Sequence, residues 1–251
     1  MLQSAYTRHF HQELPSMSES FDAPTFFAAL DARIAPYDLL QHPFYQAWSK
    51  GELTRDELRE YASEYWHHVS AFPTYLSALH ARLEDAPLRR TVLQNLAEEE
   101  GLPAGRAHSD LWMDFAAAMG ADSAEVRERP LQPETAALVA RFRGAMQASP
   151  ASALASLYTY ESRVPAIART KAEGLKQYYG ADHAAARYFT LHQTADVHHA
   201  KVWRNAIEAE LTAHREDAEG ALDAAEATAA ALWNTLTGIE RERQRTRVAA
   251  A

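Results

Sequence analysis

Three side chains of the types that bind metals lie at helical spacing in the segment YFTLHQTADVHHAKVW. His192, Asp196 and His199 occupy positions i, i+4 and i+7. At about 100° per residue, these side chains share one narrow stripe of a helix. Burying such groups costs free energy unless a cation or a hydrogen-bond network satisfies them, and a divalent metal does so. The spacing indicates either a metal site or a polar stripe exposed to solvent.

Matching ligand types occupy inward positions in three other segments. Glu161 takes a place in an otherwise apolar series, and His108 heads an apolar helix face. Glu99 shares a face with apolar residues, whereas its neighbours Glu98 and Glu100 do not. Taken singly, a glutamate triplet at a helix end is usually solvated, and a histidine there can simply be a cap. Together the four segments offer the ligands of a dinuclear iron or manganese site.

The composition excludes other kinds of site. The 251 residues include 12 histidines and no cysteine, which rules out disulfides, iron–sulfur clusters, zinc–cysteine sites and cysteine nucleophiles. A balance of 25 basic to 34 acidic residues, net −9, argues against a general nucleic-acid binder. The N-terminus lacks an apolar export signal, and acidic residues interrupt the Ala-rich stretch at 220–233. We expect a cytoplasmic protein with neither nucleic acid nor membrane as partner.

Helices must position these residues. Apolar positions recur at three- and four-residue steps, and Thr54 with Glu57 predicts a capping box at the start of a long helix. Pro73 and Pro165 predict kinks or breaks in two helices. No segment alternates with period two for long enough to form a sheet. The sequence predicts one all-α domain of about seven or more helices at 23–240, with a flexible tail at 1–22 and a polar tail at 241–251.

A family resemblance connects these residues. The motifs HPFYQAW, NLAEEEG followed by AHSDLW, YES, and HQTADVHH resemble the haem-oxygenase-like diiron oxidases, over about residues 39 to 212. The resemblance implies a haem-oxygenase-like helical bundle. It also implies a metal-ligand set, in which the segment GLPAGRA leaves the choice among Glu98, Glu99 and Glu100 open. The implied ligands are Glu99, His108, Glu161, His192, Asp196 and His199.

Within that superfamily the chain is most similar to the CADD-type para-aminobenzoate synthases, and to the related pyrroloquinoline-quinone synthase C scaffold. The resemblance implies a dinuclear Fe/Fe or Mn/Fe cofactor that uses O2 and an external reductant. Tyr45 would furnish the aromatic ring of para-aminobenzoate, for folate synthesis, and Lys171 its nitrogen. Tyr160 and Tyr188 match further tyrosines of the family. No external organic substrate is then needed, and a homodimer is a possible assembly.

Two other functions fit parts of the pattern. A diiron oxidase acting on an external fatty-acid or amino-acid derivative would use the same ligands and would tolerate Tyr45→Phe. A helical protein-interaction module would need neither metal nor Asp196. A ferritin-type site is disfavoured, because only Glu64 and His67 form a Glu-x-x-His pair. The thiaminase-type activity of this scaffold requires a cysteine, which the chain lacks.

Overall fold

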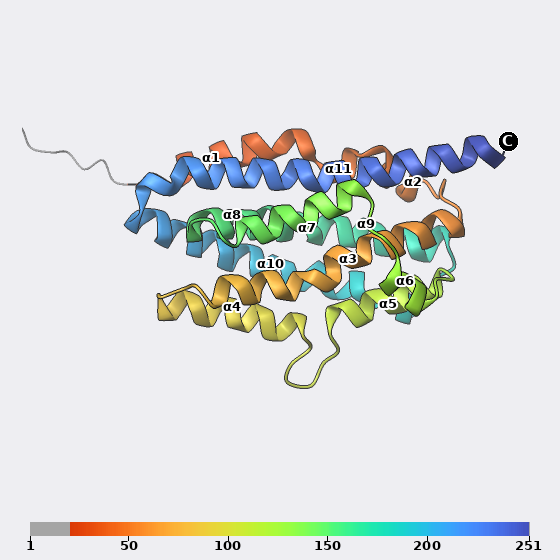
Figure 1. Cartoon of the computed structure of the whole chain (residues 1–251), viewed down its shortest axis with the longest axis horizontal. Coiled ribbons are helices and arrows are strands. Elements are labelled where there is room, and N and C mark those ends of the chain that lie inside the picture. The colour runs from red at the N-terminus through yellow and green to blue at the C-terminus, as the bar shows by residue number, and fades with distance from the viewer. Residues whose placement is uncertain (1–20, 251) are drawn as a thin grey trace, which may run out of the picture.

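The computed structural model describes residues 21–250 of the chain. These residues form helices joined by turns and contain no β-strand (Figure 1). The expected all-α class with seven or more helices is confirmed. The α-helices are α1 (Ala23–Ile34), α2 (Pro43–Ser49), α3 (Arg55–His80), α4 (Ala86–Glu99), α5 (His108–Ala118), α6 (Ser123–Glu128), α7 (Pro133–Ala145), α8 (Pro150–Glu161), α9 (Val164–Tyr178), α10 (His183–Ala213) and α11 (Ala218–Ala250). Short 3-10 helices are η1 (Ala35–Tyr37), η2 (Leu39–Gln41) and η3 (Arg215–Asp217).

Several helices begin at a side-chain cap. The Glu57 N–H donates to the Thr54 hydroxyl over 3.2 Å, and the Thr54 N–H donates to the Glu57 carboxylate over 2.8 Å. This is the capping box expected at the start of α3. The Asp182 carboxylate accepts the N–H of Ala185 at the start of α10. Such caps satisfy backbone donors that no helical carbonyl reaches, and they fix where each helix begins.

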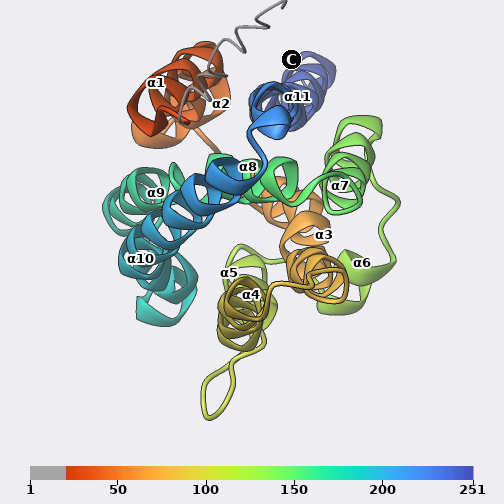
Figure 2. The same cartoon turned by 90° about the vertical axis from the view of Figure 1, so that its left-hand side faces the viewer.

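Helix α8 lies in the middle of the bundle, between α7, α9, α10 and α11 (Figure 2). Its residues 151–159 are all buried. Alanine and serine side chains on α8 let neighbouring helices approach closely, while Leu154 and Leu157 fill the core between them. Helix α10 packs against α4, α5, α8 and α9. The ends of α4, α5 and α8 therefore meet one face of α10 inside the bundle.

The two interior prolines act differently. The sequence suggested one helix from Ala151 onward, kinked at Pro165, but α8 ends at Glu161 and α9 begins at Val164. The cause is that proline clashes with the carbonyl of the residue four positions earlier, here Glu161, and is favourable in the first turn of a new helix. Pro73 instead lies inside α3, which continues to His80. Buried neighbours on both sides of Pro73 hold α3 together across the missing hydrogen bond.

Of the two expected tails, the structure describes mainly the second. Residues 1–20 lie outside the described part of the chain, so the division into tail and domain stays a prediction. Residues 241–250, suggested as a polar tail, are helical and continue α11. Arg247 holds this end of the helix, because its Nε donates to Glu57 Oε1 on α3 over 2.5 Å. Within the described residues, no helix combines the length and apolar character needed to cross a bilayer.

Candidate metal centre and aromatic pocket

The polar stripe of α10 faces the core. His192, Asp196 and His199 are 4%, 2% and 4% exposed, so the alternative of a solvated stripe is wrong. His183 and His214, near the two ends of the same helix, are exposed. The buried stripe therefore needs partners from other helices.

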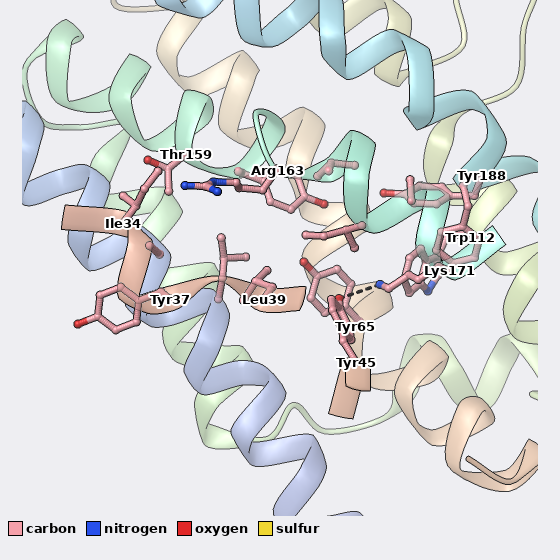
Figure 3. Close-up of a pocket in the computed structure, with 17 residues that line it drawn as sticks. Ile34, Tyr37, Leu39, Tyr45, Tyr65, Trp112, Thr159, Arg163, Lys171 and Tyr188 are labelled. Atoms are coloured by element: carbon pink, nitrogen blue, oxygen red, sulfur yellow. Dashed lines mark hydrogen bonds between the residues drawn. The ribbon is translucent and has the colours of Figure 1, made fainter. Parts of the chain in front are cut away.

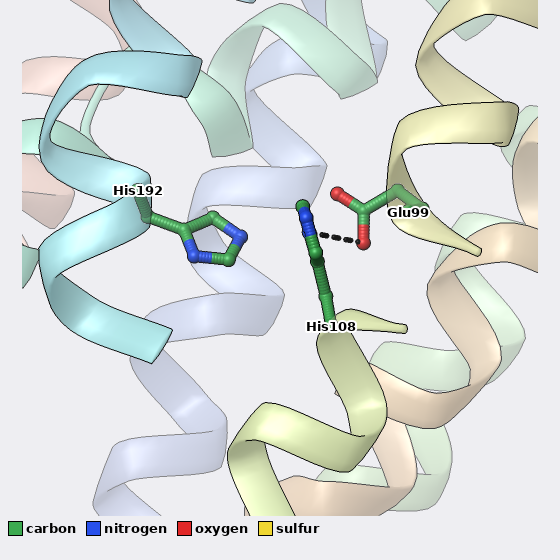
Figure 4. A group of neighbouring side chains, drawn as sticks. All are labelled: Glu99, His108 and His192. Atoms are coloured by element: carbon green, nitrogen blue, oxygen red, sulfur yellow. Dashed lines mark ion pairs between the residues drawn. The ribbon is translucent and has the colours of Figure 1, made fainter. Parts of the chain in front are cut away.

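The structure brings all six predicted ligands together as two neighbouring groups of three. Glu99, His108 and His192 form the first group (Figure 4), and Glu161, Asp196 and His199 form the second. Within each group, one ligand atom from each residue lies within 4.8 Å of the other two. Each group contains nitrogen and carboxylate donors, the mixture that suits iron and manganese.

Helix ends place three of these ligands. Glu99 is the last residue of α4, Glu161 is the last of α8, and His108 is the first of α5. A carboxylate at a helix C-terminus is disfavoured by the helix dipole, and a protonated histidine is disfavoured at an N-terminus. Both effects are relieved when the carboxylates and the neutral imidazole face a cation. The position of these three ligands at helix ends is therefore more favourable with a bound metal than without one.

The geometry separates the three consecutive glutamates. Glu99 is 5% exposed and belongs to the first group. Glu98 has a side chain 40% exposed, and its Oε2 lies 2.8 Å from His199 Nε2, so it contacts a ligand of the second group from outside. Glu100 is exposed and follows the end of α4. Glu99 is the member placed to bind metal, and its ligand role stays a prediction.

The electrostatics of the two groups call for positive charge. Burial raises the pKa of Glu161 to about 8; the charge of His199 opposes that rise, and Asp196 and Glu99 add to it. Burial alone would lower the pKa of His199, but the hydrogen bond to Asp196 and the charge of Glu161 outweigh it and raise this pKa to about 10. His108 Nδ1 lies 2.9 Å from Glu99 Oε2 but lacks hydrogen-bond geometry. Two divalent metals would therefore balance the charge of these buried side chains better than their contacts with one another do.

Two supporting residues were missed at the sequence level. Trp203 Nε1 donates to Glu161 Oε2 over 2.5 Å, and Asn95 Nδ2 donates to the same carboxylate over 3.3 Å. Trp203 follows His199 by four positions, and Asn95 precedes Glu99 by four. Both therefore continue a ligand-bearing helix face, which is the signal that could have found them. Residues that hold ligands in this way orient them and tune the metal.

A second cluster of reactive groups joins Lys171 to two phenols. Lys171 is 4% exposed, and its Nζ donates to the Tyr45 hydroxyl over 2.7 Å and also to the Tyr61 hydroxyl. The two hydroxyls are 3.2 Å apart. The sequence predicted Tyr45 and Lys171 as a pair, and the structure places them in contact. Tyr61 was not among the predicted site residues.

Close packing of α2 on α9 makes this contact. Gly174 lies against Trp48, where an added Cβ would come within 2.7 Å of the indole ring. The indole N–H of Trp48 donates to the Lys171 carbonyl over 3.3 Å. Only glycine allows this approach, which brings the Lys171 amine into a shell of aromatic rings. Rings with centres 4.3–5.8 Å from Nζ belong to Tyr45, Trp48, Tyr61, Tyr65, Trp112 and Phe189.

Burial favours the neutral forms of the amine and the phenols. Burial lowers the pKa of Lys171 well below its ordinary value. Burial also raises the pKa of Tyr45, and it raises the pKa of Tyr61 strongly. A neutral amine has a free electron pair and is a nucleophile, which an ammonium ion is not.

A pocket lies beside this cluster and is bordered by Tyr188, whose ring contacts that of His192 (Figure 3). Its cavity volume is about 40 Å³, and its lining is mainly apolar and aromatic. Tyr160 and Tyr188 line both this pocket and a smaller cavity beside Glu99, Glu161 and Asp196. The two predicted tyrosines thus form the wall between the candidate metal centre and the Tyr45–Lys171 pair.

The other histidines near the site are not in either ligand group. His68 is fully buried among aromatic rings, including Tyr160 at 5.0 Å between ring centres. Burial lowers the pKa of His68 to about 3, so the ring is neutral. Glu64 accepts the backbone N–H of Gln132 over 2.8 Å and pairs with Arg129. The Glu64–His67 pair therefore does not contribute to the ligand groups.

Comparison with known proteins agrees with this geometry. A family model described as an iron-containing redox enzyme matches residues 59–233. The chain belongs to this family. Membership in the iron-containing redox enzymes confirms the expected class of enzyme, an oxidoreductase with iron ligands, and the two ligand groups lie within the matched segment.

Two relatives match most of the chain. It is 38% identical to the 4-aminobenzoate synthase of Chlamydia pneumoniae over 212 residues, 84% of this chain and 92% of that protein. It is 41% identical to the 4-aminobenzoate synthase of Nitrosomonas europaea over 226 residues, 86% of this chain and 91% of that protein. The resemblance to this branch of the family is confirmed.

A solved structure supports the fold. A domain of unknown function with a heme oxygenase-like fold, from Shewanella denitrificans, superposes with a TM-score of 0.76 at 17% identity. The match covers 90% of this chain and 95% of that one. The expected haem-oxygenase-like bundle is confirmed.

Proposed function

We propose that this protein makes 4-aminobenzoate from its own Tyr45 and Lys171 in an oxidation that uses O2. The observation that carries the proposal is the hydrogen bond of 2.7 Å from Lys171 Nζ to the Tyr45 hydroxyl, inside a buried pocket. The nitrogen source and the carbon it must reach are thereby neighbours before any reaction. The names of the two relatives above supply the product, the family resemblance names the two side chains, and their hydrogen bond supports the pairing.

The atoms of the two side chains account for the product. The tyrosine ring and its Cβ together have the seven carbons of 4-aminobenzoate. The Cα–Cβ bond and the ring C–O bond of Tyr45 would break, with Cα taking up a hydrogen atom. The Cε–Nζ bond of Lys171 would break as an aryl C–N bond forms, with Cε oxidised and hydrolysed to an aldehyde. Cβ would be oxidised to a carboxyl carbon, with O2 as terminal electron acceptor, and the phenol oxygen would leave as water. Each chain then yields one product molecule.

Residues of the chain prepare this conversion. The shell of rings around Lys171 excludes water and keeps its amine neutral, so that its electron pair is free to attack the ring of Tyr45 once that ring is oxidised. Tyr61 accepts a second hydrogen bond from the amine and so orients it toward the Tyr45 hydroxyl. The Tyr45–Tyr61 contact of 3.2 Å gives the phenolic proton a first acceptor.

Contacting aromatic rings connect Tyr45 with the ligand helix. Ring centres are 6.3 Å apart for Tyr45 and Tyr61, 5.8 Å for Tyr61 and Trp112, and 4.9 Å for Trp112 and Tyr188. Tyr188 in turn lies 4.1 Å from the ring of His192. Electrons removed from Tyr45 can cross this distance in short steps, so Tyr45 itself need not touch the metal ligands. This assigns Tyr188 a role as a relay, with Tyr160 beside it in the same wall.

The metal ligands complete the proposal. Glu99, His108, His192, Glu161, Asp196 and His199 would hold a dinuclear Fe/Fe or Mn/Fe cofactor. When bound, this cofactor would supply oxidising equivalents drawn from O2, with electrons from an external reductant.

Isotopes test the proposal directly. Protein labelled with 13C in tyrosine and 15N in lysine is loaded with iron, or with manganese and iron, and is given reductant and O2. We expect about one equivalent of 4-aminobenzoate per chain, with a labelled ring and one 15N atom, and a matching loss of intact protein mass. Tyr45→Phe should abolish the product, whereas Tyr75→Phe, at a buried tyrosine outside the pocket lining, should not. Repeated turnover of an added substrate with Tyr45 intact would favour the external-substrate oxidase instead.

A further inference from the structure

The pocket beside Tyr45 has a charged group at its outer end. Arg163, in the turn between α8 and α9, is half-buried and lines the pocket. Figure 3 shows its guanidinium at the end of the pocket opposite Lys171, near Thr159. Eight residues along the chain from Arg163, Lys171 lies about 12 Å away along α9. The pocket thus has a guanidinium at one end and the reactive amine at the other.

The Arg163 guanidinium has no partner within the described part of the chain. No carboxylate lines this pocket, and no hydrogen bond or ion pair occupies the Arg163 side chain among residues 21–250. The walls near it are apolar side chains such as Ile34, Leu39 and Ile167. A half-buried cation facing an apolar pocket favours an anion that also has an apolar body, because such a ligand satisfies both surfaces.

We propose that the outer half of this pocket is a binding site for an aromatic carboxylate, with Arg163 pairing with the carboxylate and the apolar walls contacting the ring. This inference rests on the proposed function, since 4-aminobenzoate formed at Tyr45 is such a molecule. Its carboxyl group is ionised at neutral pH, as protein carboxyls are. Among the described residues, Arg163 and Lys171 are the only basic side chains of this lining, and burial disfavours charge on Lys171, so a product that leaves through the pocket meets the cation at Arg163.

Binding to the metal-free protein tests this site without requiring synthesis. Calorimetric titration compares 4-aminobenzoate with 4-aminobenzamide, which keeps the ring and the amine but carries no charge. We expect the acid to bind the unmodified protein at least about tenfold more tightly than the amide. Arg163→Gln should weaken the acid about 10- to 100-fold and leave the amide unchanged, since a charge-assisted bidentate pair is lost. Arg163→Lys, which keeps the positive charge but cannot form a bidentate pair with a carboxylate, should give an intermediate affinity.

Arg169→Gln is the matched control, because Arg169 is an exposed arginine on α9, the helix that follows Arg163. It removes the same charge and should bind the acid as the unmodified protein does. Equal affinity for acid and amide, an unchanged affinity in folded Arg163→Gln protein, or no binding of the acid at all would each overturn the site. If Arg163→Gln does not fold, the Arg163→Lys comparison decides.

Synthesis is measured separately on the unmodified, metal-loaded protein. Arg163-dependent binding without any synthesis would contradict the proposed function and would leave the ligand class of the pocket standing. Synthesis together with binding that ignores Arg163 would contradict only the site proposed here.

Discussion

The indole N–H of Trp203 donates to Oε2 of Glu161 over 2.5 Å, from the helix that also bears three of the proposed metal ligands. Both side chains are almost completely buried. The bond ties one carboxylate oxygen of Glu161 to α10. The other oxygen accepts a hydrogen bond from Asn95. A residue with no metal-binding chemistry of its own thereby positions the carboxylate that closes the second ligand group.

Trp203→Phe should therefore lower metal affinity while keeping the fold. We expect the affinity of one of the two metal positions to fall about 10- to 100-fold, the usual effect of losing a residue that holds a ligand. Competition with a chelator, followed by metal analysis, measures it. Trp233→Phe, at a partly exposed tryptophan on α11, is the control. Identical metal affinity in the two variants would contradict the role assigned to Trp203.

Substitutions in the glutamate triplet should have unequal effects on metal content. Glu99→Gln should reduce binding from about two metal ions per chain to about one, because Glu99 is the carboxylate of the first ligand group. Glu100→Gln should leave the content unchanged, since Glu100 is exposed. Glu98→Gln should weaken the second position only, through His199. Metal analysis of the purified variants checks the order, and a larger loss in Glu100→Gln would refute it.

The buried amine of Lys171 should make stability depend on pH. Its pKa is low in the folded chain and ordinary, near 10.5, in the unfolded chain. Between these two values the unfolded chain binds a proton that the folded chain does not. The free energy of unfolding therefore rises with pH, by up to about 1.4 kcal/mol per unit, until the pH passes 10.5.

Methionine at position 171 takes up no proton on unfolding. The free energy of unfolding of Lys171→Met, relative to that of the unmodified protein, should therefore be greatest near neutral pH and should decline as the pH rises. Urea unfolding of the metal-free proteins at several pH values up to about 10 measures the difference. Lys176→Met removes an exposed lysine from the same helix and should follow the unmodified protein. Parallel pH profiles for Lys171→Met and the unmodified protein would mean that the amine is protonated in the folded chain.

Trp112→Phe tests the path of rings. Phenylalanine keeps an aromatic side chain between Tyr61 and Tyr188 but is much harder to oxidise than tryptophan. We expect the rate of 4-aminobenzoate formation to fall at least about tenfold, which a barrier higher by about 1.4 kcal/mol produces, with metal content unchanged. Rapid mixing with O2 and timed quenching measure the rate. Tyr75→Phe, off this path, should react normally; an unaffected Trp112→Phe variant would require another route.

Much of the site could be predicted from spacing, because helical periodicity reports which side chains share a face. The stripe of His192, Asp196 and His199 and the inward position of Glu99 follow from it. Periodicity says nothing about contacts between distant helices. The pairing of Lys171 with Tyr45, 126 positions apart, depends on the close approach at Gly174 and came only from the family resemblance. Tyr61 was missed as a site residue because a phenol in the core and a functional phenol have the same helical spacing.

The turn between Glu161 and Val164 has a further consequence for how this chain can change. Glu161 is the last residue of α8 and belongs to the second ligand group. Lys171 lies on α9 and contacts Tyr45. Adding or deleting one residue in this turn would rotate α9 by about 100° and swing Lys171 away from the phenols, while all six ligands stayed in place. Related sequences that retain this chemistry should therefore vary in length in the loop at 100–107 and keep a constant length between Glu161 and Lys171.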